Sequence, residues 1–193
     1  MSYASHLQGI ASGARYPADT VMNLCPVDGR PVTILLDLER LLAERGQTGW
    51  YDPTRPNLWR FGGLLALDFD DPADRASIVT LGEGATPLLP IDGALIGVDA
   101  RLRIELKLEG RAVAGYGANP TGSFKDRGMA MVVSMARRLG LKRLAVPTQG
   151  NAGDSLARYA LAGGLEAVVV MPRDTPAPIM HRVDELARQH EAI

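Results

Sequence analysis

The sequence predicts an α/β protein in which helices pack on a parallel β-sheet. Two observations in the second half of the chain support this prediction. Short apolar segments typical of buried strands alternate with segments of helical periodicity, and glycines follow the helical segments as stop signals. Parallel strands need a long crossover connection, which is usually a helix. The composition suits a globular core, since 46% of the 193 residues are hydrophobic.

Helices and strands are expected in alternation from residue 119 onward. Apolar residues recur at offsets of three and four from Ser123 to Leu139, and Gly140 follows them. Pro147 lacks a backbone N–H group and is therefore expected at a strand end. The expected elements are helices at 123–139, 152–161 and around 179–187, and strands at 144–147 and 167–171.

The first 118 residues are more mixed. An apolar stripe predicts one helix from Val32 to Arg45, and a Pro-rich aromatic stretch at 50–59 predicts an ordered surface segment. Strands are expected at 95–98 and 102–109, of which the second alternates apolar and polar residues. No internal repeat is evident. We therefore expect an N-terminal segment over residues 1–80 and an α/β region over residues 81–193.

Composition excludes several classes of protein. Charged residues make up 22% of the chain and the net charge is -1, which predicts neither a nucleic-acid partner nor a membrane-surface partner. No apolar run reaches the roughly 18 residues of a membrane span, and the N-terminus lacks the features of a signal peptide. Cys25 is alone, so an internal disulfide is excluded. These features predict a soluble cytoplasmic protein.

A lysine lies at the expected start of the helix at 123–139. Turn dipeptides precede it, and Ser123 and Asp126 have the spacing of a capping pair. Lys125 would then lie in the first helical turn, where the helix dipole disfavours a cation by about 0.3–1 kcal/mol. A neutral amine can attack an aldehyde, although Asp126 beside it opposes this effect. Spacing alone favours the alternative, a solvated lysine at a helix end.

Two further segments have binding character. The loop at 148–152 joins a strand to a helix, where unpaired backbone N–H groups favour an anion and Gly150 allows close approach. Thr148 and Asn151 add hydrogen-bonding side chains, and the alternative is that Asn151 is only the helix N-cap. The segment at 81–90 is Gly-rich, and by itself it predicts a turn that enters a strand.

The nine residues from Pro120 to Gly128 (Pro-Thr-Gly-Ser-Phe-Lys-Asp-Arg-Gly) resemble the cofactor-lysine motif of the fold-type II pyridoxal-phosphate enzymes, most closely that of the threonine synthase family. The segments at 81–90, 148–152 and 171–174 are similar to further segments of this family, and the resemblance covers about residues 81–180. It implies a three-layer parallel-sheet fold of the tryptophan synthase β kind, in truncated form, with pyridoxal 5'-phosphate as cofactor.

The resemblance also implies a function and a site. The activity would be that of a lyase that converts O-phospho-L-homoserine and water to L-threonine and phosphate, in a protein that could form a homodimer. Lys125 would hold the cofactor and move protons, and Arg127 would either hold an anionic substrate or form a surface ion pair. Gln149 departs from the small residue of many members. The implied contacts are Lys125, Ser123, Phe124 and Asn151 with the cofactor, and Thr86, Thr148, Gln149, Gly150 and Ala152 with the substrate.

Members of this family continue well beyond this length, so we expect the 193 residues to lack the loop that binds the cofactor phosphate and to be inactive by themselves. The stretch from Cys25 to Gly29 (Cys-Pro-Val-Asp-Gly) resembles the remnant of a zinc-ribbon start, but a closed zinc site needs four ligands, and no metal is expected. Two alternatives stay open. One is another fold-type II enzyme, such as a threonine dehydratase or a cysteine synthase relative, and the other is a non-catalytic remnant or regulatory module.

Overall fold

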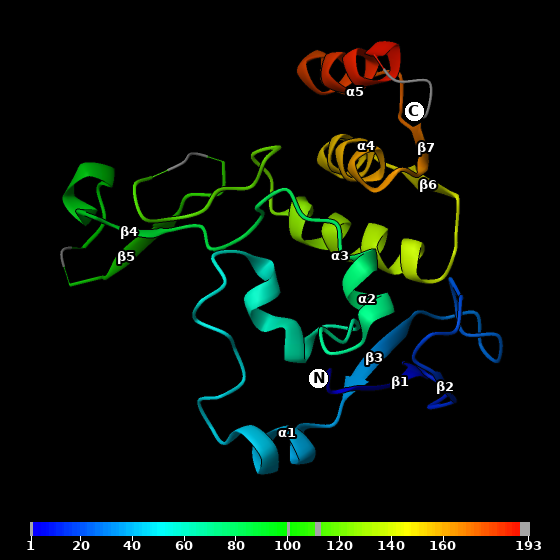
Figure 1. Ribbon diagram of the computed structural model, residues 1–193. Coiled ribbons are helices and arrows are strands. Elements are labelled where there is room, and N and C mark those ends of the chain that lie inside the picture. Colours follow the sequence, from blue (N-terminus) through cyan, green and yellow to red (C-terminus); the bar gives the residue numbers. More distant parts are fainter. Residues whose placement is uncertain (1, 100, 111–112, 190–193) are drawn as a thin grey trace. The chain divides into compact units, whose positions relative to one another are not determined.

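The computed structural model describes residues 2–99, 101–110 and 113–189, which form two compact units (Figure 1). Within the described residues, unit 1 comprises 2–55, 59–78 and 134–141, and unit 2 comprises 56–58, 79–133 and 142–189. The two units share one helix, because its residues up to Val133 group with unit 2 and those from Ser134 group with unit 1. The predicted division into an N-terminal segment, 1–80, and an α/β region, 81–193, stays a prediction.

Unit 1 is built on a small antiparallel sheet of order β2-β1-β3. Tyr3, Leu41, Trp59 and Leu67 are buried in its core. Its elements are β1 (Ala4–Gly9), β2 (Arg15–Pro17), β3 (Val32–Leu36), α1 (Leu38–Arg45), most of the 3-10 segment η1 (Leu58–Leu64) and α2 (Pro72–Ser77).

The prediction of one helix from Val32 to Arg45 is wrong in its first half, because Val32–Leu36 forms β3 and pairs with β1. The helix α1 starts only after Asp37, whose side chain caps it by accepting the amide of Arg40 at 2.9 Å. The apolar residues 32–36 satisfy helical spacing and strand alternation equally well, and pairing with β1 decides between them.

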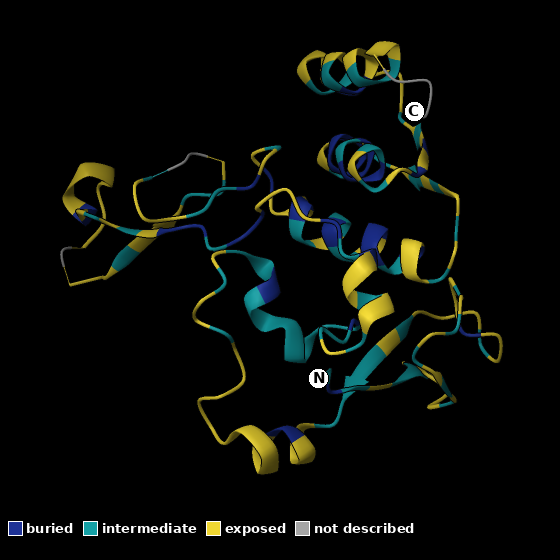
Figure 2. Cartoon of the chain, in the orientation of Figure 1, coloured by how far each residue is buried: buried dark blue, intermediate teal, exposed yellow. Residues whose placement is uncertain are grey.

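Unit 2 contains the alternating elements that the sequence predicts. The strands β6 and β7 are parallel, with Leu144 opposite Ala167, and the crossover helix α4 packs on both strands and on α5. Figure 2 shows that much of α4 is buried. The elements are β4 (Leu88–Ile91), η2 (Gly93–Ile96), β5 (Ile104–Lys107), α3 (Lys125–Arg138), β6 (Arg143–Pro147), α4 (Asn151–Gly163), β7 (Glu166–Val170) and α5 (Ala177–Gln189).

The strand predicted at 95–98 is not formed. Gly93–Ile96 is the 3-10 turn η2, which Asp92 caps through the amide of Ala94 at 3.0 Å and which ends at Gly97 in the left-handed region with φ 71°. A polar cap before the apolar residues and a glycine after them favour a tight turn over a strand. The neighbouring prediction at 102–109 is confirmed in its centre, where β5 pairs antiparallel with β4.

A large parallel sheet is absent from the part of the chain that the structure describes, where the sheets have three, two and two strands and only β6 and β7 run parallel. One face of this pair is buried at Ala167, while Val168 and Val170 on the other face are 44% and 58% exposed. The predicted alternation of helices and strands is therefore confirmed, but the predicted sheet is represented by two strands. No helix of the described residues is both long and apolar enough to cross a membrane.

Candidate active site

The first turn of α3 is fixed by the buried carboxylate of Asp126. This carboxylate accepts hydrogen bonds from the amide and the hydroxyl of Thr121, both at 2.8 Å, and from the hydroxyl of Ser155 at 2.6 Å. Gly122, with φ 80°, turns the chain so that Thr121 lies back over the helix start. The predicted capping pair is therefore half right: Ser123 Oγ accepts the Lys125 amide at 3.2 Å, but Asp126 caps Thr121 and not Ser123.

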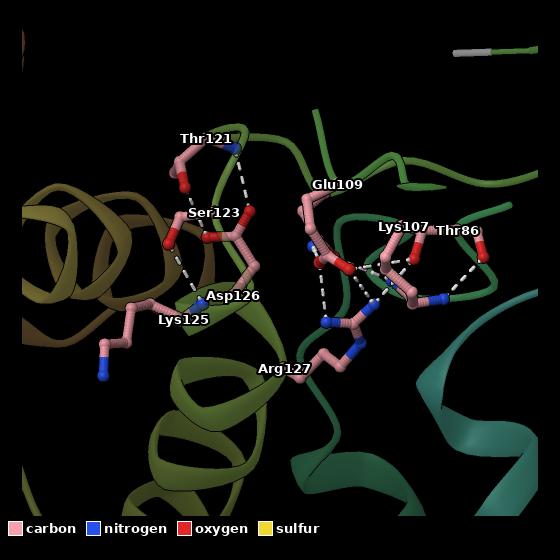
Figure 3. Close-up of polar contacts among 10 residues, drawn as sticks. Thr86, Lys107, Glu109, Thr121, Ser123, Lys125, Asp126 and Arg127 are labelled. Carbon is pink, nitrogen blue, oxygen red and sulfur yellow. Dashed lines mark hydrogen bonds and ion pairs between the residues drawn. The ribbon is translucent and has the colours of Figure 1, made fainter. Parts of the chain in front are cut away.

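Lys125 is the first residue of α3, and its side chain is exposed. Figure 3 shows it leaving the helix on the side opposite to Arg127 and turned away from the Asp126 carboxylate. Its Nζ lies 4.6 Å from the centroid of the Phe124 ring, which is itself 59% exposed. The charge of Asp126 is thus directed to Thr121 and Ser155, and the lysine amine is open to an incoming ligand.

The hydrogen bond between Asp126 and Ser155 joins the first turn of α3 to the beginning of α4. Both side chains are fully buried, so the contact fixes the two helix starts against each other. Ser155 lies only one turn after Asn151, where α4 begins. The structure therefore brings two of the predicted segments, 123–125 and 148–152, to neighbouring helix N-termini of unit 2.

The loop before α4 has little side-chain capping. Its N-cap is Gly150, which is buried and forms no side-chain cap hydrogen bond. Thr148 extends the sheet by donating its amide to Val170 O at 2.9 Å, and its hydroxyl accepts the Gly150 amide at 3.0 Å. Asn151 is the exposed first helical residue and not the N-cap, so the alternative of a purely capping asparagine does not hold. Gln149 is exposed and Ala152 is half-buried.

Gly153 explains how closely α4 approaches the strands. A Cβ at this position would lie 2.5 Å from Val169 Cγ1 and 2.7 Å from Thr148 Cγ2. Real Cβ atoms do not approach carbon this closely, so no side chain fits here without movement. Gly153 was not predicted as a packing residue, although a glycine in a helical segment signals close packing.

A polar cluster lies on the other side of α3, formed by Thr86, Lys107, Glu109, Asn119 and Arg127; we call it the Glu109 cluster (Figure 3). The Arg127 guanidinium donates to both carboxylate oxygens of Glu109, at 2.7 and 3.2 Å, and to the hydroxyl of Thr86 at 2.9 Å. Lys107 Nζ donates to Thr86 O at 2.7 Å. Asn119 donates its side-chain amide to Glu109 and accepts the Gly84 amide at 3.0 Å.

The side chains of Arg127 and Thr86 are both engaged by hydrogen bonds within the Glu109 cluster. Burial alone would raise the pKa of Glu109, but the hydrogen bonds and the charge of Arg127 outweigh burial and hold this pKa below its usual value. Arg127 is thus held in a half-buried bidentate ion pair, as one of its two predicted roles required. Thr86 is 6% exposed, with its hydroxyl engaged by Arg127 and Glu109. Glu109 was not predicted as a functional residue, because it lies at the end of an ordinary alternating strand.

The Gly-rich segment at 81–90 forms a turn that enters β4, as its composition predicts. Its Glu83 is fully buried and accepts hydrogen bonds from the Tyr159 hydroxyl at 2.7 Å, the Leu81 amide at 2.9 Å and the Thr80 hydroxyl at 3.0 Å. Burial, followed by the contact with Glu83, raises the pKa of Tyr159. Glu83 therefore fastens this turn to the middle of α4.

Comparison with known proteins agrees with this arrangement of segments. A family model described as "Pyridoxal-phosphate dependent enzyme" matches residues 79–191. The chain is 34% identical over 174 residues to the threonine synthase of Methanosarcina acetivorans, covering 86% of this chain and 37% of that protein. It is 31% identical to the threonine synthase of Methanocaldococcus jannaschii, covering 84% of this chain and 36% of the relative. It is 39% identical to the threonine synthase of Synechocystis sp., covering 52% of this chain and 24% of the relative.

The chain thus spans little more than a third of the length of the two archaeal relatives. The family match includes the turn at 81–90, the start of α3 with Lys125, and the start of α4 with Asn151, which are the segments that the structure connects through Asp126 and Glu83. The chain belongs to the family of pyridoxal-phosphate dependent enzymes.

Proposed function

We propose that this chain carries the lysine-bearing part of the active site of a threonine synthase, which converts O-phospho-L-homoserine and water to L-threonine and phosphate. One observation carries the proposal. Lys125 opens α3 with an exposed amine, while the neighbouring Asp126 joins the starts of α3 and α4. The names of the relatives support the choice of reaction. The homodimer that the resemblance implies and the cytoplasmic location that the composition predicts belong to the same proposal.

The residues at the two helix starts fit a pyridoxal phosphate group chemically. Lys125 offers a primary amine, Asn151 offers an exposed amide, and the N-terminus of α4 offers the backbone N–H groups of Asn151 and Ala152, which no side chain caps. Bound pyridoxal phosphate supplies an electron sink for carbanions formed on an amino-acid substrate. In this proposal Lys125 holds the cofactor, Asn151 tunes its ring, and Ser123 and Phe124 flank the lysine.

The protein's own contribution is the placement of the lysine. Ser123 fixes the Lys125 backbone through its amide, and the Phe124 ring lies beside Nζ. Asp126 anchors the helix start without pairing its charge with the amine, so Nζ is free to take up and release a proton at the substrate carbons. Because only the backbone of Lys125 is fixed, its side chain can still extend toward a ligand while its Cα stays in place.

The substrate carboxylate is proposed to bind the loop formed by Thr148, Gln149, Gly150 and Ala152, at the positive end of the α4 dipole. Thr86 is the less accessible member of the predicted substrate set, because its hydroxyl bonds to Arg127 and Glu109. For Thr86 we propose that substrate contact, if it occurs, replaces the hydrogen bond from Arg127.

The test exploits the fact that the chain contains only three lysines, Lys107, Lys125 and Lys142. Pyridoxal phosphate is added to the purified chain, the visible absorption band is recorded, and borohydride reduction is followed by peptide mapping. We expect the label on Lys125 and loss of the band in Lys125→Ala, while Lys142→Ala, a change at an exposed lysine, keeps both. Equal labelling of Lys125 and Lys142 would refute a specific site in this chain.

Substrate choice needs a second measurement. A longer form of the protein is assayed with O-phospho-L-homoserine, L-threonine and O-acetyl-L-serine, and the released phosphate, ammonia or acetate is measured. Phosphate release that depends on Lys125 supports threonine synthase. Turnover of L-threonine or O-acetyl-L-serine alone would instead assign a dehydratase or a cysteine synthase relative.

A further inference from the structure

Unit 1 contains two turns with the same backbone hydrogen bonds, at residues 9–14 and 25–30. In each turn the amide of the first residue donates to the carbonyl of the sixth, at 2.9 Å in the first turn and 2.8 Å in the second. The amide of the fifth residue donates to the carbonyl of the first, again at 2.9 and 2.8 Å. The fifth residue is a glycine in the left-handed region in both, with φ 70° at Gly13 and 66° at Gly29. The two turns are therefore a structural repeat that the sequence does not reveal.

The first and fourth residues of the two turns face one another. Ser12 Oγ lies 3.3 Å from Cys25 Sγ. A Cβ on Gly9 would point into the same space, 2.5 Å from Ser12 Oγ and 2.8 Å from Cys25 Sγ. Asp28 completes the set, with its buried Oδ2 lacking a hydrogen-bond partner. The Arg30 amide donates to Asp28 Oδ1 at 2.9 Å and lowers the pKa of Asp28, against the opposing effect of burial.

Positions 9, 12, 25 and 28 have the spacing of a four-ligand metal site, in which two residues separate the ligands of each pair. Their chemistry does not fit a metal. Gly9 has no side chain, Ser12 is a weak ligand, and only Cys25 and Asp28 can bind a metal well. Among the described residues there is no group of three His, Cys, Asp or Glu side chains that could hold a metal ion.

We infer that unit 1 retains the backbone of a four-ligand metal site and closes it without metal, through hydrogen bonds to the Cys25 thiol. Two hydroxyls make these bonds: Ser12 Oγ from the first turn, and Tyr16 Oη from β2, each 3.3 Å from Cys25 Sγ. Cys25 is 1% exposed, so these contacts lie in the interior of unit 1. A hydrogen bond is stronger there than in water, because the local dielectric constant is low. The Cys25 thiol thus connects the two turns, as a bound metal ion would in a four-ligand site.

The decisive experiment restores the ligands. The triple variant Gly9→Cys, Ser12→Cys, Asp28→Cys keeps Cys25 and places four thiols at the facing positions. The new Cβ at position 9 would lie 2.8 Å from Cys25 Sγ, so the side chains at 12 and 25 must rotate toward a shared ion. Gly9 can accept a side chain conformationally, because it is not among the glycines with positive φ. We expect it to bind about one Zn²⁺ per chain and to give the tetrahedral thiolate spectrum with Co²⁺. The wild-type chain is expected to bind neither ion.

The matched control carries the same number of thiols one step out of register. Ile10→Cys, Ala11→Cys and Val27→Cys alter exposed residues of the same two turns. Equal metal binding by this control, or no tetrahedral Co²⁺ spectrum in the restored variant, would overturn the inference. If the restored variant fails to fold without metal, it is refolded with Zn²⁺; failure to recover the wild-type circular dichroism would also overturn it.

A second measurement tests the hydrogen-bonded closure in the native sequence. Cys25→Ala should lower the midpoint of thermal unfolding by roughly 2–4 °C, because the hydroxyls of Ser12 and Tyr16 lose their shared partner. Addition of a chelator should leave the wild-type midpoint unchanged. A chelator-sensitive wild-type midpoint would show that a metal, and not the thiol, closes the turns.

Discussion

The first turns of α3 and α4 each follow a loop that carries predicted site residues, but the two helix starts are stabilised differently. At α3, side chains of its own segment satisfy the backbone: Ser123 accepts the Lys125 amide, and the buried Asp126 accepts two hydrogen bonds from Thr121. At α4, the N-cap is Gly150 without a side-chain bond, and Asn151 is exposed. The first is internally complete. At the second, the Thr148 hydroxyl accepts the Gly150 amide, and the amides of Asn151 and Ala152 are left for a ligand.

This difference separates the two tasks of a lysine-dependent site. In the proposed function the reacting lysine must be held in one place, and the buried hydrogen bonds of Asp126 fix the helix start that carries Lys125. The residues that receive an anion must keep their N–H groups unpaired, and a glycine N-cap, which has no side chain, leaves the amides of Asn151 and Ala152 uncapped. The predictions below test each half of this comparison.

The largest effect is expected for Asp126→Ala, which should destabilise the protein by about 3 kcal/mol. It leaves the amide and hydroxyl of Thr121 and the hydroxyl of Ser155 without their buried acceptor. The free energy of unfolding in urea measures the loss. Ser155→Ala removes only one of the three bonds and should cost about 1 kcal/mol. A loss below that of Ser155→Ala would show that Asp126 does not organise the start of α3.

An intermediate effect with opposite signs is expected at two helical glycines. Gly153→Ala should destabilise by about 1–3 kcal/mol, because its Cβ meets Val169 and Thr148. Gly128→Ala in α3 meets no atom within 4 Å and should stabilise by about 0.5–1 kcal/mol through better helix propensity. Urea unfolding of both variants is compared under identical conditions. Equal stabilisation by both substitutions would mean that α4 does not pack closely on β7.

The smallest effect on stability is expected for Asn151→Ala, at less than about 0.5 kcal/mol. Asn151 is exposed and follows the N-cap, whereas loss of a capping side chain typically costs about 1 kcal/mol. The same variant should bind pyridoxal phosphate more weakly in an absorbance titration. A loss near 1 kcal/mol without any change in cofactor affinity would reassign Asn151 to a structural role.

Periodicity predicted the second half of the chain well, because α3, α4 and α5 and the strands β6 and β7 carry their own local signals. It failed at Val32–Leu36, where pairing with β1 outweighs helical spacing. The lysine motif singles out Lys125 because its residues are contiguous in the sequence, and the role of Lys125 as the cofactor lysine stays a prediction. Glu109 and Gly153 were missed because their roles depend on partners far away in the sequence, namely Arg127 and Val169.

The two turns of unit 1 need little stabilisation from a cross-link such as a metal ion, because the chain between them is already largely ordered. Ser12 and Cys25 are 13 residues apart, and pairing of β1 with β2 already fixes the chain as far as Pro17. Only the residues between Pro17 and Cys25 remain to be closed. Loop-closure entropy rises by only about 0.6 kcal/mol for each doubling of length, so a loop this short needs little compensation. With the inferred closure by a thiol and two hydroxyls, the fold of unit 1 does not require a bound zinc ion.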